Sequence, residues 1–241
     1  MKSNLEHYFL WQLRDFIRER GVAMLLIGLL FGMTVIVPMK VATSATGTQL
    51  TDRMATQILM LVLPQVSFIT SFIVLNGLVS TDRIRGYYRF LFSKPVSVPV
   101  YYAQAFLVSF LGYCTVFTIL LALFVAFVKP IMPFGTLAFG ALVFLSLGGI
   151  AFFISSLFRR DWIVLSVVLA GTWIMGSWWG QKGGIRQAFV QLLPPLGKLT
   201  GQMDGLVNRG TANPADVFHV LGYSALFFAA GLIVLHRRPI G

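Results

Sequence analysis

The sequence predicts an all-α integral membrane protein of about six transmembrane helices. Three observations support this fold class: 57% of the 241 residues are hydrophobic, only 11% are charged, and the hydrophobic residues fall in long uncharged runs. A chain of this size with so few charges cannot cover a soluble globule, and long uncharged apolar runs are typical of membrane spans. We expect residues 1–241 to form a single transmembrane domain.

Six runs reach or approach the roughly 20 residues that a transmembrane helix needs. The predicted spans are Val22–Val41, Met54–Ser80, Tyr101–Val128, Phe134–Phe158, Trp162–Trp179 and Val217–Leu235. The first five have no acidic or basic residue in their middle, and the sixth carries only His219, near its start. We expect Pro64 to interrupt the second span.

The distribution of Lys and Arg predicts the orientation of these spans. Twelve of the 19 fall on one side: Lys2, Arg14, Arg18, Arg20, Arg83, Arg85, Arg89, Lys94, Arg159, Arg160, Arg237 and Arg238. Seven fall on the other: Lys40, Arg53, Lys129, Lys182, Arg186, Lys198 and Arg209. The positive-inside rule then places both termini in the cytoplasm. Because these basic residues form short clusters between apolar runs, the net charge of +11 indicates membrane orientation and no nucleic-acid partner.

The first 20 residues predict an amphipathic helix that lies along the cytoplasmic surface of the membrane. Apolar residues recur at helical spacing, and polar residues, Gln12 among them, lie elsewhere on the helix. The apolar set is Leu5, Tyr8, Phe9, Leu13, Phe16 and Ile17. We expect the chain to turn into the membrane at Gly21; an ordinary cytoplasmic helix packed on a partner is the alternative.

The segment 180–216, before the last span, predicts an external loop with one short helix. Ile185, Phe189 and Leu193 lie on one helical stripe, which ends at Pro194-Pro195. The rest, from Gly201 onward, reads as loop because it is rich in Gly, Asn and Asp. Asn213 and Pro214 predict the start of the last helix.

The sequence contains none of the catalytic motifs of several common enzyme classes. No G-x-x-x-x-G-K-[ST] phosphate loop, H-E-x-x-H pair or G-x-S-x-G motif occurs, so we expect no enzyme in this chain alone. Cys114, the only cysteine, excludes an intrachain disulfide and a multi-cysteine metal site. Because no ionisable residue lies deep in a predicted span, a proton or sodium relay is not expected.

The loop between the second and third predicted spans, 81–97, carries an unusual sequence. A charged cluster with Asp82, Arg83 and Arg85 leads to Gly86, and an aromatic and apolar stretch follows before a Ser-Lys-Pro stop. The stretch and stop contain Tyr87, Tyr88, Phe90, Leu91, Ser93, Lys94 and Pro95. We expect a short cytoplasmic helix over Arg83–Phe92 with an apolar patch that needs a partner.

This loop resembles the one between spans two and three of ABC-2 type ABC transporter permeases. In that family an acidic and basic cluster, a Gly and a Leu-rich stretch lead into Ser-Lys-Pro-Val-Ser, as at residues 93–97 here. Asp82 stands where a Glu is commoner, and Tyr87-Tyr88 replace smaller residues. The N-terminal helix, Ser155–Arg159 and Leu193-Pro194-Pro195 also resemble that family, in the same order along the chain.

The resemblance implies a permease subunit in a prokaryotic plasma membrane. Its expected partners are a separate ATP-binding subunit and a second permease, either a copy of this chain or a paralogue. The loop would be the coupling helix that docks on the ATPase, with the turn Arg159-Arg160-Asp161 as a second contact. This chain would bind no cofactor, since ATP and Mg²⁺ would be held by the partner.

The resemblance also implies that spans two and five line the transport path. The candidate pathway or dimer-interface residues are Gln65, Asn76, Thr172 and Trp173. Gln65 and Asn76 are eleven residues apart, which aligns them on one helical face. The alternative is that such amides join helices by hydrogen bonds, and the glycines Gly28, Gly32, Gly148 and Gly149 likewise suit helix packing.

The resemblance also implies ATP-driven export, since permeases of this family and size are typically exporters. We expect an amphipathic, lipid-like or peptide substrate, because a path without fixed charge does not suit a bare ion. Two alternatives stay open. One is an ATPase-driven mechanical transmitter or anchor that acts on an external partner without transport; the other is a self-sufficient carrier.

Overall fold

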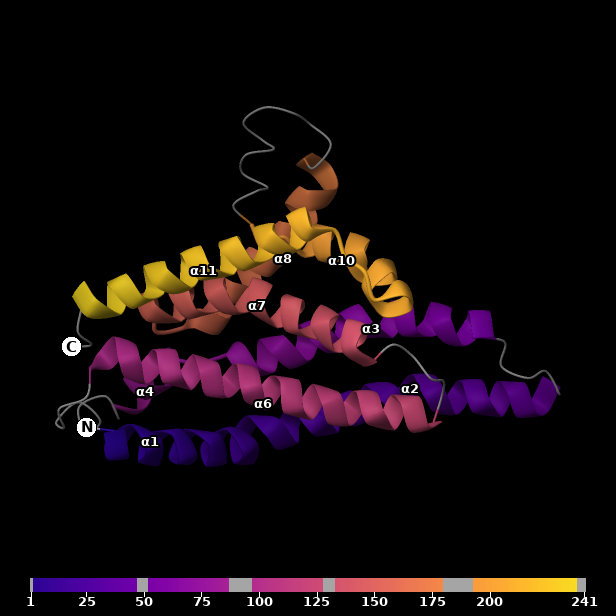
Figure 1. Cartoon of the computed structure of the whole chain (residues 1–241), viewed down its shortest axis with the longest axis horizontal. Coiled ribbons are helices and arrows are strands. Elements are labelled where there is room, and N and C mark those ends of the chain that lie inside the picture. The colour runs from indigo at the N-terminus through magenta and orange to yellow at the C-terminus, as the bar shows by residue number, and fades with distance from the viewer. Residues whose placement is uncertain (1, 47–51, 87–96, 128–132, 180–192, 238–241) are drawn as a thin grey trace. The chain divides into compact units, whose positions relative to one another are not determined.

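The computed structural model describes residues 2–46, 52–86, 97–127, 133–179 and 193–237. In these residues the chain is helical and contains no β-strand (Figure 1). The elements are α1 (Lys2–Asp15), η1 (Phe16–Gly21), α2 (Val22–Thr46), α3 (Asp52–Leu75), α4 (Ser80–Arg85), α6 (Val98–Phe127), α7 (Pro133–Leu157), α8 (Asp161–Trp179), α10 (Leu196–Asp204), η2 (Gly205–Arg209) and α11 (Pro214–Arg237).

Four stretches of the described chain are helical, long and apolar enough to cross a membrane: Gln57–Asp82, Val98–Ala126, Pro133–Leu157 and Pro214–Arg237. A shorter apolar helix covers Asp161–Met175. The chain is therefore an all-helical, multi-pass membrane protein, as its composition predicts.

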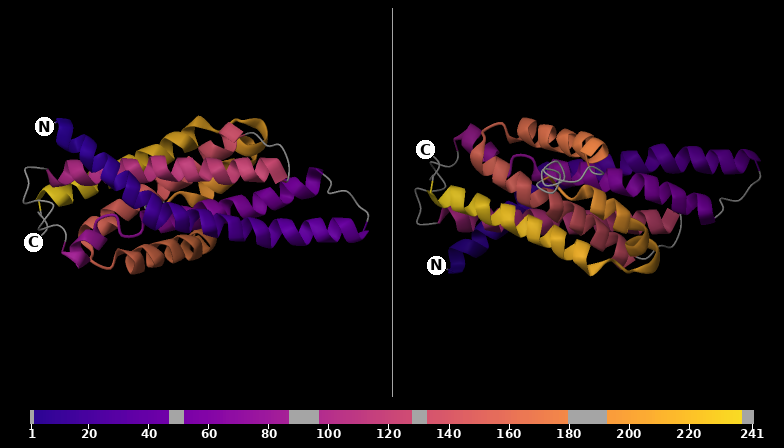
Figure 2. Two further views of the ribbon diagram at one scale, coloured as in Figure 1. Left: turned by 90° about the horizontal axis from the view of Figure 1, so that it is seen from below. Right: turned by 90° about the horizontal axis from the view of Figure 1, so that it is seen from above.

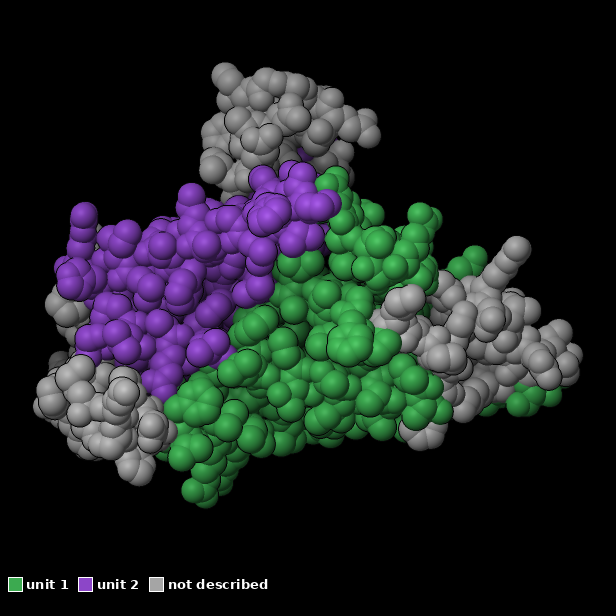
Figure 3. Space-filling model, viewed as in Figure 1, with its two compact units in different colours: residues 1–74, 108–144, 200–213 green, residues 75–107, 145–199, 214–241 purple. Residues whose placement is uncertain are grey.

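The chain divides into two compact units (Figure 3). Unit 1 contains residues 1–74, 108–144 and 200–213, and unit 2 contains residues 75–107, 145–199 and 214–241. Because α3, α6 and α7 each pass a boundary, each unit is built from segments that are far apart in the sequence.

Unit 1 contains an aromatic contact between α6 and α7 and a close approach of α2 to α6 at a glycine. The rings of Tyr113 and Phe144 lie 4.8 Å apart, and both side chains are fully buried. The helices α2 and α3 run side by side in this unit (Figure 2). At Gly28 of α2 an added Cβ would collide with the side chain of Leu120 in α6, so a glycine permits this close approach.

Unit 2 has an aromatic core between α6, α7 and α11. Phe152 of α7 lies 6.0 Å from Phe106 and 4.7 Å from Phe228, measured between ring centroids. At Gly149 an added Cβ would collide with the backbone of Ser224 in α11. Gly149 therefore serves close helix packing, as the sequence suggests.

The N-terminal helix differs from the prediction in its buried face. Phe16 is buried as expected, but Gln12 is only 7% exposed while Ile17 is 56% exposed. Helical spacing joins Gln12, Phe16 and Arg20 on one face, and Phe16 fills the space beside Gly112 of α6. The packed face is thus chosen by the fit to α6 and not by apolarity alone.

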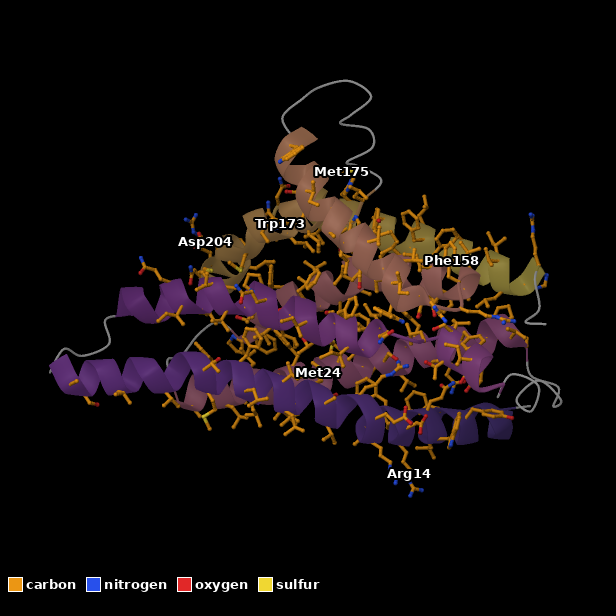
Figure 4. The ribbon with its side chains drawn as sticks, turned by 180° about the vertical axis from the view of Figure 1, so that it is seen from behind. Arg14, Met24, Phe158, Trp173, Met175 and Asp204 are labelled. Atoms are coloured by element: carbon orange, nitrogen blue, oxygen red, sulfur yellow. The ribbon has the colours of Figure 1, made fainter. Side chains whose placement is uncertain are left out.

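The predicted turn at Gly21 is also different, because the chain stays helical from Lys2 to Thr46. The change of direction between α1 and α2, visible in Figure 2, takes place through the π-helical turn η1. A π-helical turn widens the helix locally and is a recognised cause of bending. Figure 4 shows the side chain of Arg14, before the bend, directed away from the protein and that of Met24, after it, directed inward.

The interpretation of the chain beyond Gly201 as loop is wrong. Leu196–Asp204 forms α10, and Gly205–Arg209 continues it as the π-helical turn η2. Leu199, Met203 and Val207 recur every four residues and are all buried, which favours a helix despite the glycines. The short helix predicted near Ile185 lies outside the described residues. The predicted start of the last helix at Pro214 is confirmed.

Candidate functional site

The candidate functional site is the break between α3 and α4. α3 ends at Leu75, residues 76–79 form a turn, and α4 begins at Ser80. Gly77 has a φ angle of +73°, a left-handed conformation that a glycine adopts without a steric penalty. The second predicted span, Met54–Ser80, therefore contains a break at the Asn76-Gly77 pair.

Pro64 does not interrupt α3, contrary to the prediction. The helix continues through Pro64 for a further eleven residues to Leu75. In a membrane-spanning helix, neighbouring helices can compensate for the hydrogen bond that a proline removes. The irregular backbone lies at the Asn76-Gly77 turn instead.

Two side chains on either side of the α7–α8 turn, Ser155 of α7 and Asp161 of α8, satisfy the backbone of this break. The amide of Gly77 donates to the carboxylate of Asp161, with a nitrogen–oxygen distance of 3.2 Å. The amides of Val79 and Ser80 both donate to the Oγ of Ser155, at 3.0 and 3.1 Å. A helix start normally receives its acceptor from the residue just before it, whereas α4 receives it from residues about 75 positions later in the chain.

These acceptors are buried. Ser155 has no exposed surface and Asp161 is 5% exposed. Asp161 also accepts a hydrogen bond from the amide of Trp162 at 2.9 Å, so one carboxylate joins the α3–α4 break to the first turn of α8. Because a buried amide without an acceptor costs about 1–3 kcal/mol, these bonds fix the position of α4.

A further hydrogen bond ties α4 to the start of α6. The hydroxyl of Tyr102 donates to Asp82 at 3.2 Å, and the Tyr102 side chain is 1% exposed. The ring of Tyr102 meets that of Tyr101 edge-on at 5.1 Å. Asp82, which the sequence places in a coupling loop, thus anchors α4 within unit 2.

The outer surface of α4 is open. Ile84 is 66% exposed, and Gly86 ends the helix in a left-handed conformation with a φ angle of +70°. The continuous helix predicted over Arg83–Phe92 is therefore wrong at Gly86. Seven predicted coupling residues lie outside the described residues: Tyr87, Tyr88, Phe90, Leu91, Ser93, Lys94 and Pro95.

The turn Arg159-Arg160-Asp161, predicted as a second contact with the ATPase, lies in the same unit as α4. Arg159 and Arg160 form an exposed bend between α7 and α8, directly before the buried Asp161. Since Ser155 and Asp161 hold the α3–α4 break, the structure brings the ends of both predicted cytoplasmic loops together within unit 2.

In unit 1, the last turn of α3 has its own support. The guanidinium of Arg20 donates to the carbonyl of Val74 at 2.8 Å. Carbonyl groups in the last turn of a helix lack partners within the helix, and a basic side chain there satisfies one of them. A residue assigned from the sequence to membrane orientation thus supports the end of α3.

The structure does not align the candidate pathway residues as predicted. Gln65 is exposed on α3, but Asn76 lies beyond the end of that helix, so a single helical face cannot carry both. Trp173 is 83% exposed on α8. The hydroxyl of Thr172 donates to the carbonyl of Val168 in its own helix at 2.8 Å.

A buried hydroxyl cluster in unit 1 was not predicted. The phenol of Tyr113 in α6 faces the hydroxyl groups of Ser67, Thr70 and Ser71 in α3, and all four side chains are buried. The spacing of Ser67, Thr70 and Ser71 on one helical face was the available signal. No hydrogen bond joins the two helices here: within the described structure the hydroxyls of Tyr113, Ser67 and Ser71 have no partner, and that of Thr70 donates to a carbonyl of α3.

Two further findings concern the chemistry of the site. Within the described residues, no group of three or more His, Cys, Asp or Glu side chains lies together. Comparison of the chain with known protein families, curated proteins and solved structures finds no match.

Proposed function

We propose that this chain is the membrane subunit of an exporter powered by a separate ATPase, of the ABC-2 permease type that its loop resembles. The observation that carries the proposal is the attachment of α4: this short helix follows α3 after a break, and buried side chains at the end of α7 and the start of α8 fix its position. An ATPase that pushes on α4 would thereby move α7 and α8 as well.

The hydrogen bonds of the break suit this transmission of force. Three buried amides would lose their acceptors if α4 moved away from Ser155 and Asp161, at a cost of about 1–3 kcal/mol each. α4 therefore moves together with its neighbours and not as a free loop. The exposed Ile84 on α4 and the exposed Arg159 and Arg160, in the same unit, offer a partner an apolar contact and two charges.

The proposal includes six spans with both termini in the cytoplasm of a prokaryotic cell. α2 and α8 would be the two spans besides the four long apolar stretches. The excess of Lys and Arg on the side of α4 supports this orientation. ATP and Mg²⁺ would be bound by the partner, because the sequence contains no phosphate loop.

Association with the ATPase tests the proposal. The chain is co-expressed with a phosphate-loop ATPase taken from a neighbouring reading frame, if one is encoded there, and Ile84→Asp is compared with Thr211→Asp, which adds the same charge at an exposed position before α11. We expect Ile84→Asp to abolish co-purification and stimulation of ATP turnover, and Thr211→Asp to preserve both. Unchanged association in Ile84→Asp and in the triple variant Tyr87→Asp, Tyr88→Asp, Leu91→Asp would refute the docking of this loop.

Reconstitution separates export from the two alternatives. We expect vesicles with both subunits to move an amphipathic, lipid-like or peptide substrate only with ATP. Transport by the chain without the ATPase would identify a self-sufficient carrier. ATP turnover that depends on an external protein partner, without transport, would identify a mechanical transmitter.

A further inference from the structure

We infer that unit 1 contains a binding site for one acyl chain of a membrane phospholipid. The site is an apolar pocket of about 340 Å³ formed by α2, α3 and α6. Five residues of α2, four of α3 and five of α6 line it, all of them Gly, Leu, Val, Met or Phe. No lining side chain carries a nitrogen or an oxygen atom.

The sequence builds this pocket from complete helical faces. Leu59, Val62, Leu63 and Val66 of α3 follow the spacing i, i+3, i+4, i+7, and α6 repeats that spacing from Phe117 to Phe124. On α2 the lining includes Gly28 and Gly32, one turn apart. Gly28 lets the side chain of Leu120, itself a lining residue, approach α2 closely, so that α6 and α3 can enclose the pocket against α2.

The pocket has a closed floor and an open mouth. Among its lining residues, Leu59, Leu63, Phe117 and Leu121 are at most 8% exposed and form the floor. Met33 and Val37 of α2 are 62% and 48% exposed and form the rim. The lining parts of α3 and α6 belong to two stretches that are long and apolar enough to cross a membrane, so the mouth opens to hydrocarbon.

The apolar lining of the pocket favours an alkyl chain as its ligand. A cavity without polar partners does not retain ordered water, and an apolar cavity of about 150 Å³ admits one benzene ring, so this pocket has room for roughly a dozen carbon atoms. One acyl chain supplies that many carbons in a single flexible molecule. A second copy of the protein would have to fill the same pocket with several separate side chains, each of which ends after a few carbons.

This site is independent of the proposed coupling to an ATPase. The lining residues lie in unit 1, whereas α4 and the α7–α8 turn lie in unit 2. A lipid bound in this pocket would be found in the purified protein whether or not an ATPase binds the protein. If one of the two proposals fails, the other is still tested by its own experiment.

Photolabelling of the full chain tests the site. The protein is placed in nanodiscs of phosphatidylcholine in which a small fraction carries a diazirine in the middle of one acyl chain, and labelled peptides are quantified by mass spectrometry. The reference is the outer face of α11, where Phe218, Leu226 and Ile233 are 72%, 65% and 52% exposed. We expect several-fold more label on the pocket peptides than on this face.

Two variants fill the pocket from different helices, so the result does not depend on the folding of one protein. Gly32→Phe and Val62→Phe should each reduce labelling of the pocket peptides to the level of α11, while Leu226→Phe, which adds bulk to the outer face of α11, should leave it unchanged. Equal labelling of pocket and α11 in the unmodified chain would overturn the inference. Pocket labelling that persists in both filling variants, or links between two protein copies at these peptides, would also overturn it.

Discussion

At the scale of single residues, Ser155 and Asp161 hold the α3–α4 break in place. One hydroxyl and one carboxylate accept hydrogen bonds from three amides of the α3–α4 break, and both are buried. The sequence places Ser155 at the end of a span and Asp161 in a charged turn. Nothing in their local sequence indicates which distant backbone they contact.

The stability of the chain should depend on the Asp161 carboxylate. Asp161→Ala leaves the amides of Gly77 and Trp162 without this acceptor, and we expect a loss of about 1–3 kcal/mol in the free energy of unfolding. Thermal unfolding in detergent measures the effect. The matched control is Asp204→Ala, which removes an exposed carboxylate paired with Arg209 at 3.7 Å and should change stability by less than about 1 kcal/mol. Equal effects of the two variants would contradict the buried role of Asp161.

Hydrogen exchange should reveal the role of Ser155. Ser155→Ala removes the acceptor of the Val79 and Ser80 amides, and we expect faster exchange in the peptide that covers residues 76–86. The control is Ser156→Ala, because the Ser156 hydroxyl donates to the carbonyl of Phe153 in its own helix. If exchange in this peptide is the same in both variants, Ser155 does not hold α4.

At the scale of elements, small residues decide which helices approach closely. Gly149 of α7 lies against the backbone of α11, whereas Gly171 of α8 has no described atom within 4 Å of the position of an added Cβ. Both glycines read alike in the sequence, as small residues inside apolar runs. Only the packing distinguishes the one that is required from the one that is not.

Substitution of these two glycines should therefore have opposite results. Gly149→Ala forces α11 to shift, because its backbone cannot move aside as a side chain can, and we expect a loss of about 1–3 kcal/mol. Gly171→Ala should leave stability unchanged or raise it by up to about 1 kcal/mol, because alanine favours the helix. Thermal unfolding of both variants is the measurement, and a stable Gly149→Ala protein would show that α7 and α11 are not in close contact.

In the helices of unit 1, apolar spacing in the sequence does not predict which face is buried. Apolar spacing predicts that Ile17 is buried and Gln12 is not, whereas the structure has the reverse. In a membrane protein an apolar side chain can face lipid at no cost, so apolarity does not mark the packed face of a helix. The same reason explains the exposed Leu26, Leu30 and Met33 of α2.

At the scale of the whole molecule, the topology is the property most open to a direct test. The proposal of six spans requires that α2 and α8 both cross the membrane. Arg14 and Ser44 are exposed before α2 and near its end, and Arg159 and Thr211 are exposed before α8 and before α11. A crossing by α2 separates the first pair, and a crossing by α8 separates the second.

Single cysteines at these four positions should therefore label differently. In a Cys114→Ser background, which removes the only native cysteine, we expect Ser44→Cys and Thr211→Cys to react with a membrane-impermeant maleimide in intact cells. Arg14→Cys and Arg159→Cys should react only after the cells are opened. Equal labelling of Arg14→Cys and Ser44→Cys would show that α2 does not cross, and equal labelling of Arg159→Cys and Thr211→Cys would show the same for α8.

The amino-acid sequence by itself determined that this protein is helical and crosses the membrane several times. Hydrocarbon excludes charge and demands internal backbone hydrogen bonds, so long uncharged runs can become only helices there. Only the tertiary structure decided where the second span breaks and which acceptors hold α4. Those features depend on contacts between residues such as Gly77 and Asp161, 84 positions apart, and local sequence patterns carry no information about such pairs.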